Sequence, residues 1–326
     1  MPWLRHRLVL PPAGPLSHLD WLRSFRPSVL EEDDGTLRMW YSAHDGERGR
    51  ILEAVQDGSA AMWRRVALSI DGGGRQGVHS PSVVRTAGGY VMAYVDAGGT
   101  SARLHLATSE DGHRWEEQGP IGALDRQGQV DDGHAAHPSL VVTGENWWLF
   151  HTGHPGRNGA DGDDGADAHD GADGDAAVGH DGAPDHRRAA IMAAVSTDGT
   201  TWDSVGTVLA PQGTEVALSA PAVLVRRRRF TMVYVSDDGD RTVIDLATSG
   251  DGIDWDRRGT TLAQGPQAGA EGGVHSPSTL RLRAGGLRLW YSTRTDADEA
   301  DGCRMWSADF VTPPPSRTPA DHTLPG

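Results

Sequence analysis

The sequence contains no lysine, so arginine supplies every strongly basic side chain. Schiff-base chemistry and a phosphate-binding P-loop lysine are therefore excluded. There is a single cysteine, Cys303, which rules out an intrachain disulfide, and we expect a buried, unreactive thiol. Long apolar runs are also missing. The N-terminal segment is interrupted by Pro11 and Pro12 and has no signal-peptide core, which favours a cytoplasmic protein.

Acidic residues outnumber basic ones, and the formal net charge is −15. A protein of this charge repels nucleic acids and anionic membranes at long range, so we expect neither as a partner. A small-molecule substrate is the expected partner, and the sequence leaves the oligomeric state open.

One strand-opening pattern of the Pro-Ser type recurs five times. The copies begin at Pro27, Pro81, Pro138, Pro221 and Pro277, with spacings of 54, 57, 83 and 56 residues. Each is followed by an apolar, aromatic-rich run such as Met39-Trp40-Tyr41 or Leu289-Trp290-Tyr291. Because β-branched and aromatic residues between Gly/Asp turns are typical of strands, each repeat predicts a small antiparallel sheet.

A turn of the form Ser-x-Asp-Gly-x-x-Trp closes three of the repeats, at residues 109–115, 196–202 and 249–255. The Asp-Gly pair suits a tight hairpin, because glycine accepts a positive φ and aspartate bonds to nearby amides. We expect the tryptophan to pack between neighbouring sheets. This turn therefore indicates architecture and not a catalytic centre.

The repeats predict an all-β protein: a single five-bladed β-propeller, residues 1–326, with four-stranded antiparallel blades. The blades are expected at about 24–75, 78–130, 134–212, 218–265 and 274–310. The last repeat lacks a fourth strand, and residues 3–10 resemble the fourth-strand segment 63–68. The N-terminal strand is therefore expected to complete the last blade, which leaves no exposed sheet edge.

The long spacing in the third repeat comes from an insertion at about residues 155–188, rich in Gly, Asp and Ala. Its composition cannot bury enough apolar surface to order the chain, so we expect a disordered loop. Residues 311–326 are expected to form a C-terminal tail.

The repeat resembles the five-bladed β-propeller glycoside hydrolase clan that includes arabinanases, xylosidases, fructosidases and mannoside phosphorylases. The resemblance covers nearly the whole chain outside the insertion. It implies a central depression, with an Asp, an Asp and a Glu on successive innermost strands as base, orienting residue and acid. The matching positions here hold Arg26, Ser80 and His137, so the usual catalytic carboxylates are not matched.

Other side chains in the segments before the innermost strands are candidates for acid/base work. The candidate acids are Asp20, Asp131, Asp132, Glu215 and Glu271; as isolated residues, acids are usually solvated or cap turns. The catalytic set that we predict combines three of these acids with three histidines: His79, His137, His275, Asp132, Glu215 and Glu271.

The three histidines also suggest a metal site, because His79 and His275 lie in identical Val-His-Ser-Pro-Ser openings. Three imidazoles aimed at one axis would suit Zn, Fe or Cu. In the clan a lone axial histidine can instead lie above a structural cation such as Ca. The alternative is that each histidine only bonds to the backbone of a neighbouring blade.

Five further residues near these openings are expected to bind substrate: Arg26, Ser80, Ser276, His134 and His151. Arg26 is a candidate clamp for a carboxylate or phosphate, because its charge is permanent and its donors form a fork. A salt bridge to a neighbouring blade is the other interpretation.

These observations give three functional hypotheses. The first is a glycoside hydrolase-like enzyme that acts on a small glycoside or sugar-like metabolite by general acid/base chemistry. The second is a histidine-ligated, metal-dependent hydrolase, lyase or cyclase of specialised metabolism. The third is a carbohydrate-binding protein without catalytic activity.

Overall fold

The computed structural model describes residues 3–10, 16–20, 23–56, 63–72, 77–97, 102–124, 135–144, 146–155, 189–263, 273–294 and 303–310. Within this part of the chain the regular structure is almost entirely β, with two short 3-10 helices, η1 (Ser17–Leu19) and η2 (Gly122–Leu124). None of its helices is long and apolar enough to cross a membrane. The expected insertion, apart from Pro155, and the expected C-terminal tail lie outside the described residues.

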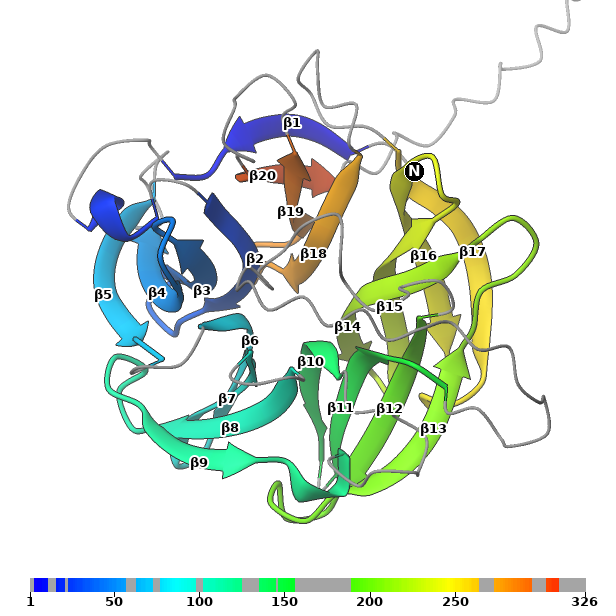
Figure 1. Cartoon of the computed structure of the whole chain (residues 1–326), viewed down its shortest axis with the longest axis horizontal. Helices are drawn as coiled ribbons and strands as arrows, with labels where there is room; N and C mark the ends of the chain where they lie inside the picture. The colour runs from blue at the N-terminus through cyan, green and yellow to red at the C-terminus, as the bar shows by residue number, and fades with distance from the viewer. Residues whose placement is uncertain are drawn as a thin grey trace, which may run out of the picture.

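The strands form five groups of four, which we call sheets I to V (Figure 1). Sheet I contains β2 (Arg23–Glu31), β3 (Leu37–His44), β4 (Gly49–Gln56) and β5 (Arg64–Ile70). Sheet II contains β6 (Val78–Thr86), β7 (Gly89–Asp96), β8 (Arg103–Ser109) and β9 (Glu116–Pro120). Sheet III contains β10 (Ala136–Thr143), β11 (Asn146–Gly153), β12 (Ala190–Ser196) and β13 (Asp203–Leu209).

Sheet IV contains β14 (Ala217–Arg226), β15 (Arg229–Asp237), β16 (Thr242–Ser249) and β17 (Trp255–Leu262). Sheet V contains β18 (Val274–Arg281), β19 (Leu287–Arg294), β20 (Cys303–Phe310) and the N-terminal β1 (Trp3–Leu8). Neighbouring strands within each sheet are antiparallel. The pairing of β1 with β20, as the sequence predicts, supplies the fourth strand of sheet V, and one parallel pair, Arg23 with Cys303, joins sheets V and I.

The first strands of the sheets, β2, β6, β10, β14 and β18, contact one another in cyclic order, and β18 returns to β2. Figure 1 shows the sheets arranged around this central group. Side chains on one strand alternate between the two faces of a sheet. Trp40 therefore packs against sheet II, whereas its neighbours Met39 and Tyr41 pack toward sheet V.

The hydrophobic core is divided into five clusters, one at each junction between neighbouring sheets. Apolar surface is thus removed from water on both faces of every sheet, which is the main favourable contribution to folding. Polar groups join the same junctions. Arg38 on sheet I pairs with Glu53 at 2.8 Å and donates to the carbonyl of Asp111 on sheet II at 2.9 Å.

The Ser-x-Asp-Gly turns have the structure that their sequence predicts. In the first copy, the Asp111 carboxylate accepts the amides of His113 and Arg114, and the Ser109 hydroxyl accepts the amide of Gly112. Gly112 has a φ of 75°, which favours glycine. The tryptophan that ends this turn, Trp115, meets Trp40 of sheet I at 6.0 Å between ring centroids. These turns therefore dock one sheet on the next.

Candidate functional site

Each innermost strand contains one residue with left-handed backbone, directly before its proline. These five residues, which we call the central ring, have φ between 50° and 57°: Arg26, Ser80, His137, Ala220 and Ser276. The strand register shifts at the same point in all five sheets, as at a β-bulge. Bulges redirect side chains and are common beside active sites.

The ring backbone is strained, since a non-glycine residue in this conformation costs about 1–3 kcal/mol. Hydroxyl groups of the preceding sheet support it at two positions. Ser42 accepts the Ser80 amide at 2.8 Å, and Thr152 accepts the Ala220 amide at 2.9 Å. The ring conformation is therefore imposed partly by contacts between sheets.

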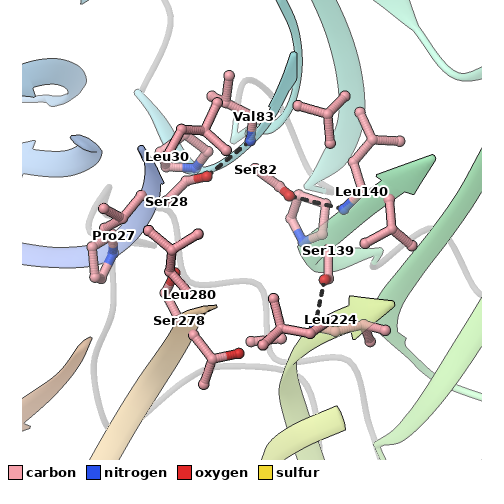
Figure 2. Close-up of a pocket in the computed structure, with 18 of the residues that line it drawn as sticks. Pro27, Ser28, Leu30, Ser82, Val83, Ser139, Leu140, Leu224, Ser278 and Leu280 are labelled. Carbon is pink, nitrogen blue, oxygen red and sulfur yellow. Dashed lines mark hydrogen bonds between the residues drawn. The ribbon is translucent and has the colours of Figure 1, made fainter. Parts of the chain in front are cut away.

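A cavity of about 160 Å³ lies at the centre of the molecule, next to the ring. It is lined by the four residues that follow each ring position, Pro27–Leu30 in sheet I and their counterparts in the other sheets. Figure 2 shows these side chains facing one another across the centre. In all five sheets the ring position therefore directly precedes the lining of this cavity, which we call the central channel.

Serines of the Pro-Ser openings link the inner strands around this channel (Figure 2). Ser28 accepts the Val83 amide at 2.9 Å, Ser82 accepts the Leu140 amide at 2.8 Å, and Ser139 accepts the Val223 amide at 3.0 Å. The fourth position is Ala222, which has no hydroxyl group. The recurring serine is thus a structural link between sheets, a role that the strand pattern alone does not indicate.

Arg26, His79 and Ser80 form one polar cluster in the ring. The Arg26 Nη1 donates to His79 Nδ1 at 2.9 Å and to Ser80 Oγ at 2.7 Å. Burial lowers the pKa of Arg26 to about 10, which still leaves the guanidinium charged at neutral pH. Burial, together with the nearby Arg26 charge, holds the pKa of His79 well below its usual value. His79 is therefore a neutral imidazole that accepts from a cation.

His137 and His275 lie in other parts of the ring region and have separate partners. The His137 Nδ1 is 3.0 Å from the Thr152 hydroxyl, and both ring nitrogens of His275 are 3.4 Å from the Thr242 hydroxyl. Ser276 occupies the ring position next to His275.

The described residues alone do not form the three-histidine metal site predicted on His79, His137 and His275. Within the described residues, no group of three His, Cys, Asp or Glu side chains is placed to hold a metal ion. The physical reason is that the imidazoles have different local partners, and His79 lies beside the Arg26 cation, which repels a second positive charge. Three other predicted site residues, Asp132, His134 and Glu271, lie outside the described residues, as does the candidate acid Asp131.

Two of the candidate acids are held in ion pairs by the structure. Glu215 accepts from both Arg257, at 2.6 and 2.8 Å, and the Ser236 hydroxyl at 3.1 Å. Asp20 is buried and pairs with Arg65 at 2.8 Å. Both carboxylates are therefore paired with arginine side chains. Neither is at a ring position.

His151, a predicted substrate ligand, is only 1% exposed. Burial lowers its pKa to about 4, so this side chain is neutral at neutral pH. Ser80 is likewise buried, at 3% exposure, and its hydroxyl orients the Arg26 guanidinium. The structure therefore brings together Arg26, His79 and Ser80.

The comparisons with known proteins support the fold. No known protein-family profile matches the sequence. Two uncharacterised Mycobacterium tuberculosis proteins, MT1551 and Rv1502, are 33% identical over 108 residues. This match covers 30% of the chain and 36% of either relative, so it spans about a third of their length.

Solved structures match over almost the whole chain. The protein BT0996, solved as a complex with RGII, has a TM-score of 0.69 and 15% identity, and the match covers 98% of the present sequence and 93% of BT0996. A thermostable family-43 glycoside hydrolase has a TM-score of 0.65 and 12% identity, with coverages of 89% and 90%. The Bombyx mori GH32 β-fructofuranosidase BmSUC1 has a TM-score of 0.65 and 10% identity, with coverages of 92% and 60%. The protein therefore has the fold of the propeller glycoside hydrolases.

Proposed function

We propose that sheets I to V are the blades of a five-bladed β-propeller, and that its central ring binds a small glycoside or sugar-like metabolite. The ring itself carries this proposal. Five strained, bulged positions directly precede the residues that line one central cavity, and the side chains of Arg26, Ser80 and His137 hydrogen-bond to neighbouring side chains. Strain of this kind persists mainly where a site depends on it.

Hydrolysis by the two-carboxylate route has no support at the ring. That route needs a protonated acid and an ionised base, about 6.5–9.5 Å apart in inverting enzymes. The five ring positions hold one cation, one imidazole and three residues without charge. Glu215 forms an ion pair with Arg257. Ligand binding without hydrolysis is therefore the function that the described residues support best.

A second candidate is general acid/base catalysis by His137. This imidazole occupies the ring position that corresponds to an acid in the resembling clan, and Thr152 orients it through Nδ1. Histidine is the side chain most often used for proton transfer near neutral pH. The proposal in this case is turnover of the bound glycoside without a carboxylate pair.

Calorimetry with a panel of monosaccharides and methyl glycosides tests both candidates. We expect binding of at least one sugar and no product by NMR after prolonged incubation. Ser276→Tyr, which fills the ring, should weaken binding at least tenfold, whereas Ser204→Tyr on the exposed outer strand β13 should not. Product formation that His137→Ala abolishes would favour the catalytic candidate. Failure of every sugar to bind would overturn the proposed function.

A further inference from the structure

Arg26, which is half-buried, differs from three buried arginines whose partners the structure describes. Arg38 pairs with Glu53, Arg50 with Asp45, and Arg65 with Asp20, so each of these cations has a carboxylate partner. Arg26 forms no ion pair with a described residue; its hydrogen bonds go to a neutral imidazole and a hydroxyl. A charge removed from water without a counter-charge is unfavourable.

The surroundings of Arg26 are neutral as well. Its guanidinium lies over the ring of Phe25, 5.2 Å from the centroid, which offers only weak compensation. His79 is uncharged, and the lowered pKa of Arg26 reflects burial that is offset only in part by its electrostatic interaction with Cys303. The fold therefore holds a cation in the central ring, and no carboxylate among the described residues forms an ion pair with it.

Two nitrogen atoms of the Arg26 guanidinium, Nε and Nη2, have no hydrogen-bond acceptor among the described residues. His79 and Ser80 both engage Nη1, which fixes the plane of the guanidinium. The Nε atom is buried and has no hydrogen-bond partner, and no described residue accepts from Nη2. Arginine binds carboxylates and phosphates through two parallel N–H donors, and an oxyanion at this guanidinium would supply both an acceptor and the missing counter-charge.

We propose that the ligand of the central ring carries an oxyanion, a carboxylate or a phosphate, that binds the Arg26 guanidinium. This inference rests on the proposed function, since it names the chemical class of the sugar-like ligand. His79 and Ser80 act as positioning residues, because they hold Nη1 in place. The ligand is an acidic sugar, of the uronate or sugar-phosphate type.

Calorimetry at constant ionic strength, with D-glucose, D-glucuronate and D-glucose 6-phosphate as probes, tests this inference. We expect at least one acidic sugar to bind about ten times more tightly than D-glucose. The acid that binds better identifies the oxyanion as carboxylate or phosphate. Arg26→Gln should remove the preference for the acidic sugar over D-glucose, and Arg26→Lys should keep part of this preference. Arg258→Gln, an exposed arginine of β17, is the matched control and should change nothing.

Measurements of the melting temperature distinguish an effect of Arg26→Gln on folding from an effect on binding. If Arg26 is an uncompensated cation, Arg26→Gln should melt no lower than the wild type in buffer without anions, and inorganic phosphate should raise the melting temperature of the wild type only. Equal affinity of Arg26→Gln and wild type for the acidic sugars would overturn the inference, as would D-glucose binding as tightly as both acids. In the second case the sugar-binding proposal would still stand. Lack of binding by all three sugars would instead count against the proposed function.

Discussion

The buried histidines of this protein make its stability depend on pH. His151 is 1% exposed, and its pKa falls from 6.5 to about 4 on folding. The unfolded chain therefore takes up a proton below pH 6.5 that the folded protein does not, so stability is present above pH 6.5 and is lost progressively toward pH 4. The lowered pKa of His79 acts in the same direction.

His151→Gln should reduce this loss of stability in acid. Between pH 7 and pH 5 the proton linkage of His151 amounts to about 2 kcal/mol. Urea unfolding at the two pH values should therefore show a difference that is smaller by about that amount in the variant. His18→Gln, which removes an exposed histidine, serves as the control and should leave the difference unchanged. An unchanged pH dependence in His151→Gln would contradict this account.

The partners of individual site residues were the least predictable part of the molecule. The sequence predicts Arg26 as a candidate anion clamp, because its side-chain type and its place directly before Pro27 can be read from it. Its contact with His79 spans 53 residues, and the pairing of Glu215 with Arg257 spans 42. The first contact joins sheets I and II, and the second joins the segment before β14 to β17 of sheet IV. No local sequence pattern encodes either contact.

At the scale of strands, the serine links around the channel give the Pro-Ser repeat its function. Each link satisfies a backbone amide of the next sheet, and Ser139 is buried. A lost hydroxyl leaves a buried amide without a partner, which costs about 1–3 kcal/mol. The innermost strands are therefore joined by side chains as well as by apolar packing.

Ser139→Ala should lower the free energy of unfolding by about 1–2 kcal/mol, because the Val223 amide loses its acceptor. The reverse change at the fourth position, Ala222→Ser, should raise it by up to about 1 kcal/mol, since the new hydroxyl occupies the place equivalent to Ser139. Urea unfolding measures both. Ser204→Ala on the outer strand is the control, and equal stability of Ser139→Ala and the wild type would rule out the link.

Strands and turns were predictable because their signals are local. Alternating apolar residues and Asp-Gly turns indicate the strands and hairpins directly. The left-handed conformation at the ring was not predictable in this way. A residue before proline normally prefers an extended conformation, so the sequence predicts an extended backbone where the structure has a left-handed one. Hydroxyl groups from other sheets, Ser42 and Thr152, stabilise it at two of the five positions.

At the scale of the molecule, the N-terminal strand connects sheets IV and V. Trp3 on β1 is 7% exposed, meets Phe310 of β20 at 5.6 Å between ring centroids, and donates from Nε1 to the Thr261 hydroxyl of β17 at 2.8 Å. It also belongs to the hydrophobic cluster between these two sheets. The first residues of the chain therefore support a junction built from its last third.

Trp3→Ala should destabilise the protein by about 3–5 kcal/mol, the usual cost of removing a buried tryptophan. Guanidinium chloride unfolding is the measurement. Leu4→Ala provides a neighbouring control, since Leu4 is 46% exposed and its truncation should cost no more than about 0.5 kcal/mol. A loss below about 1 kcal/mol in Trp3→Ala would mean that β1 is not needed to hold sheets IV and V together.

The strained ring has a consequence for how chemistry changes in this architecture. Its side chains are directed by the backbone of each bulge, so their direction does not depend on which residue is present. Arg, Ser, His and Ala all adopt the same conformation there, with φ between 50° and 57°. The function of the ring can therefore change without loss of the fold. Substitution at these five positions exchanges the functional groups and leaves the backbone of the scaffold as it is. Engineering new specificity into this protein should begin at those five codons.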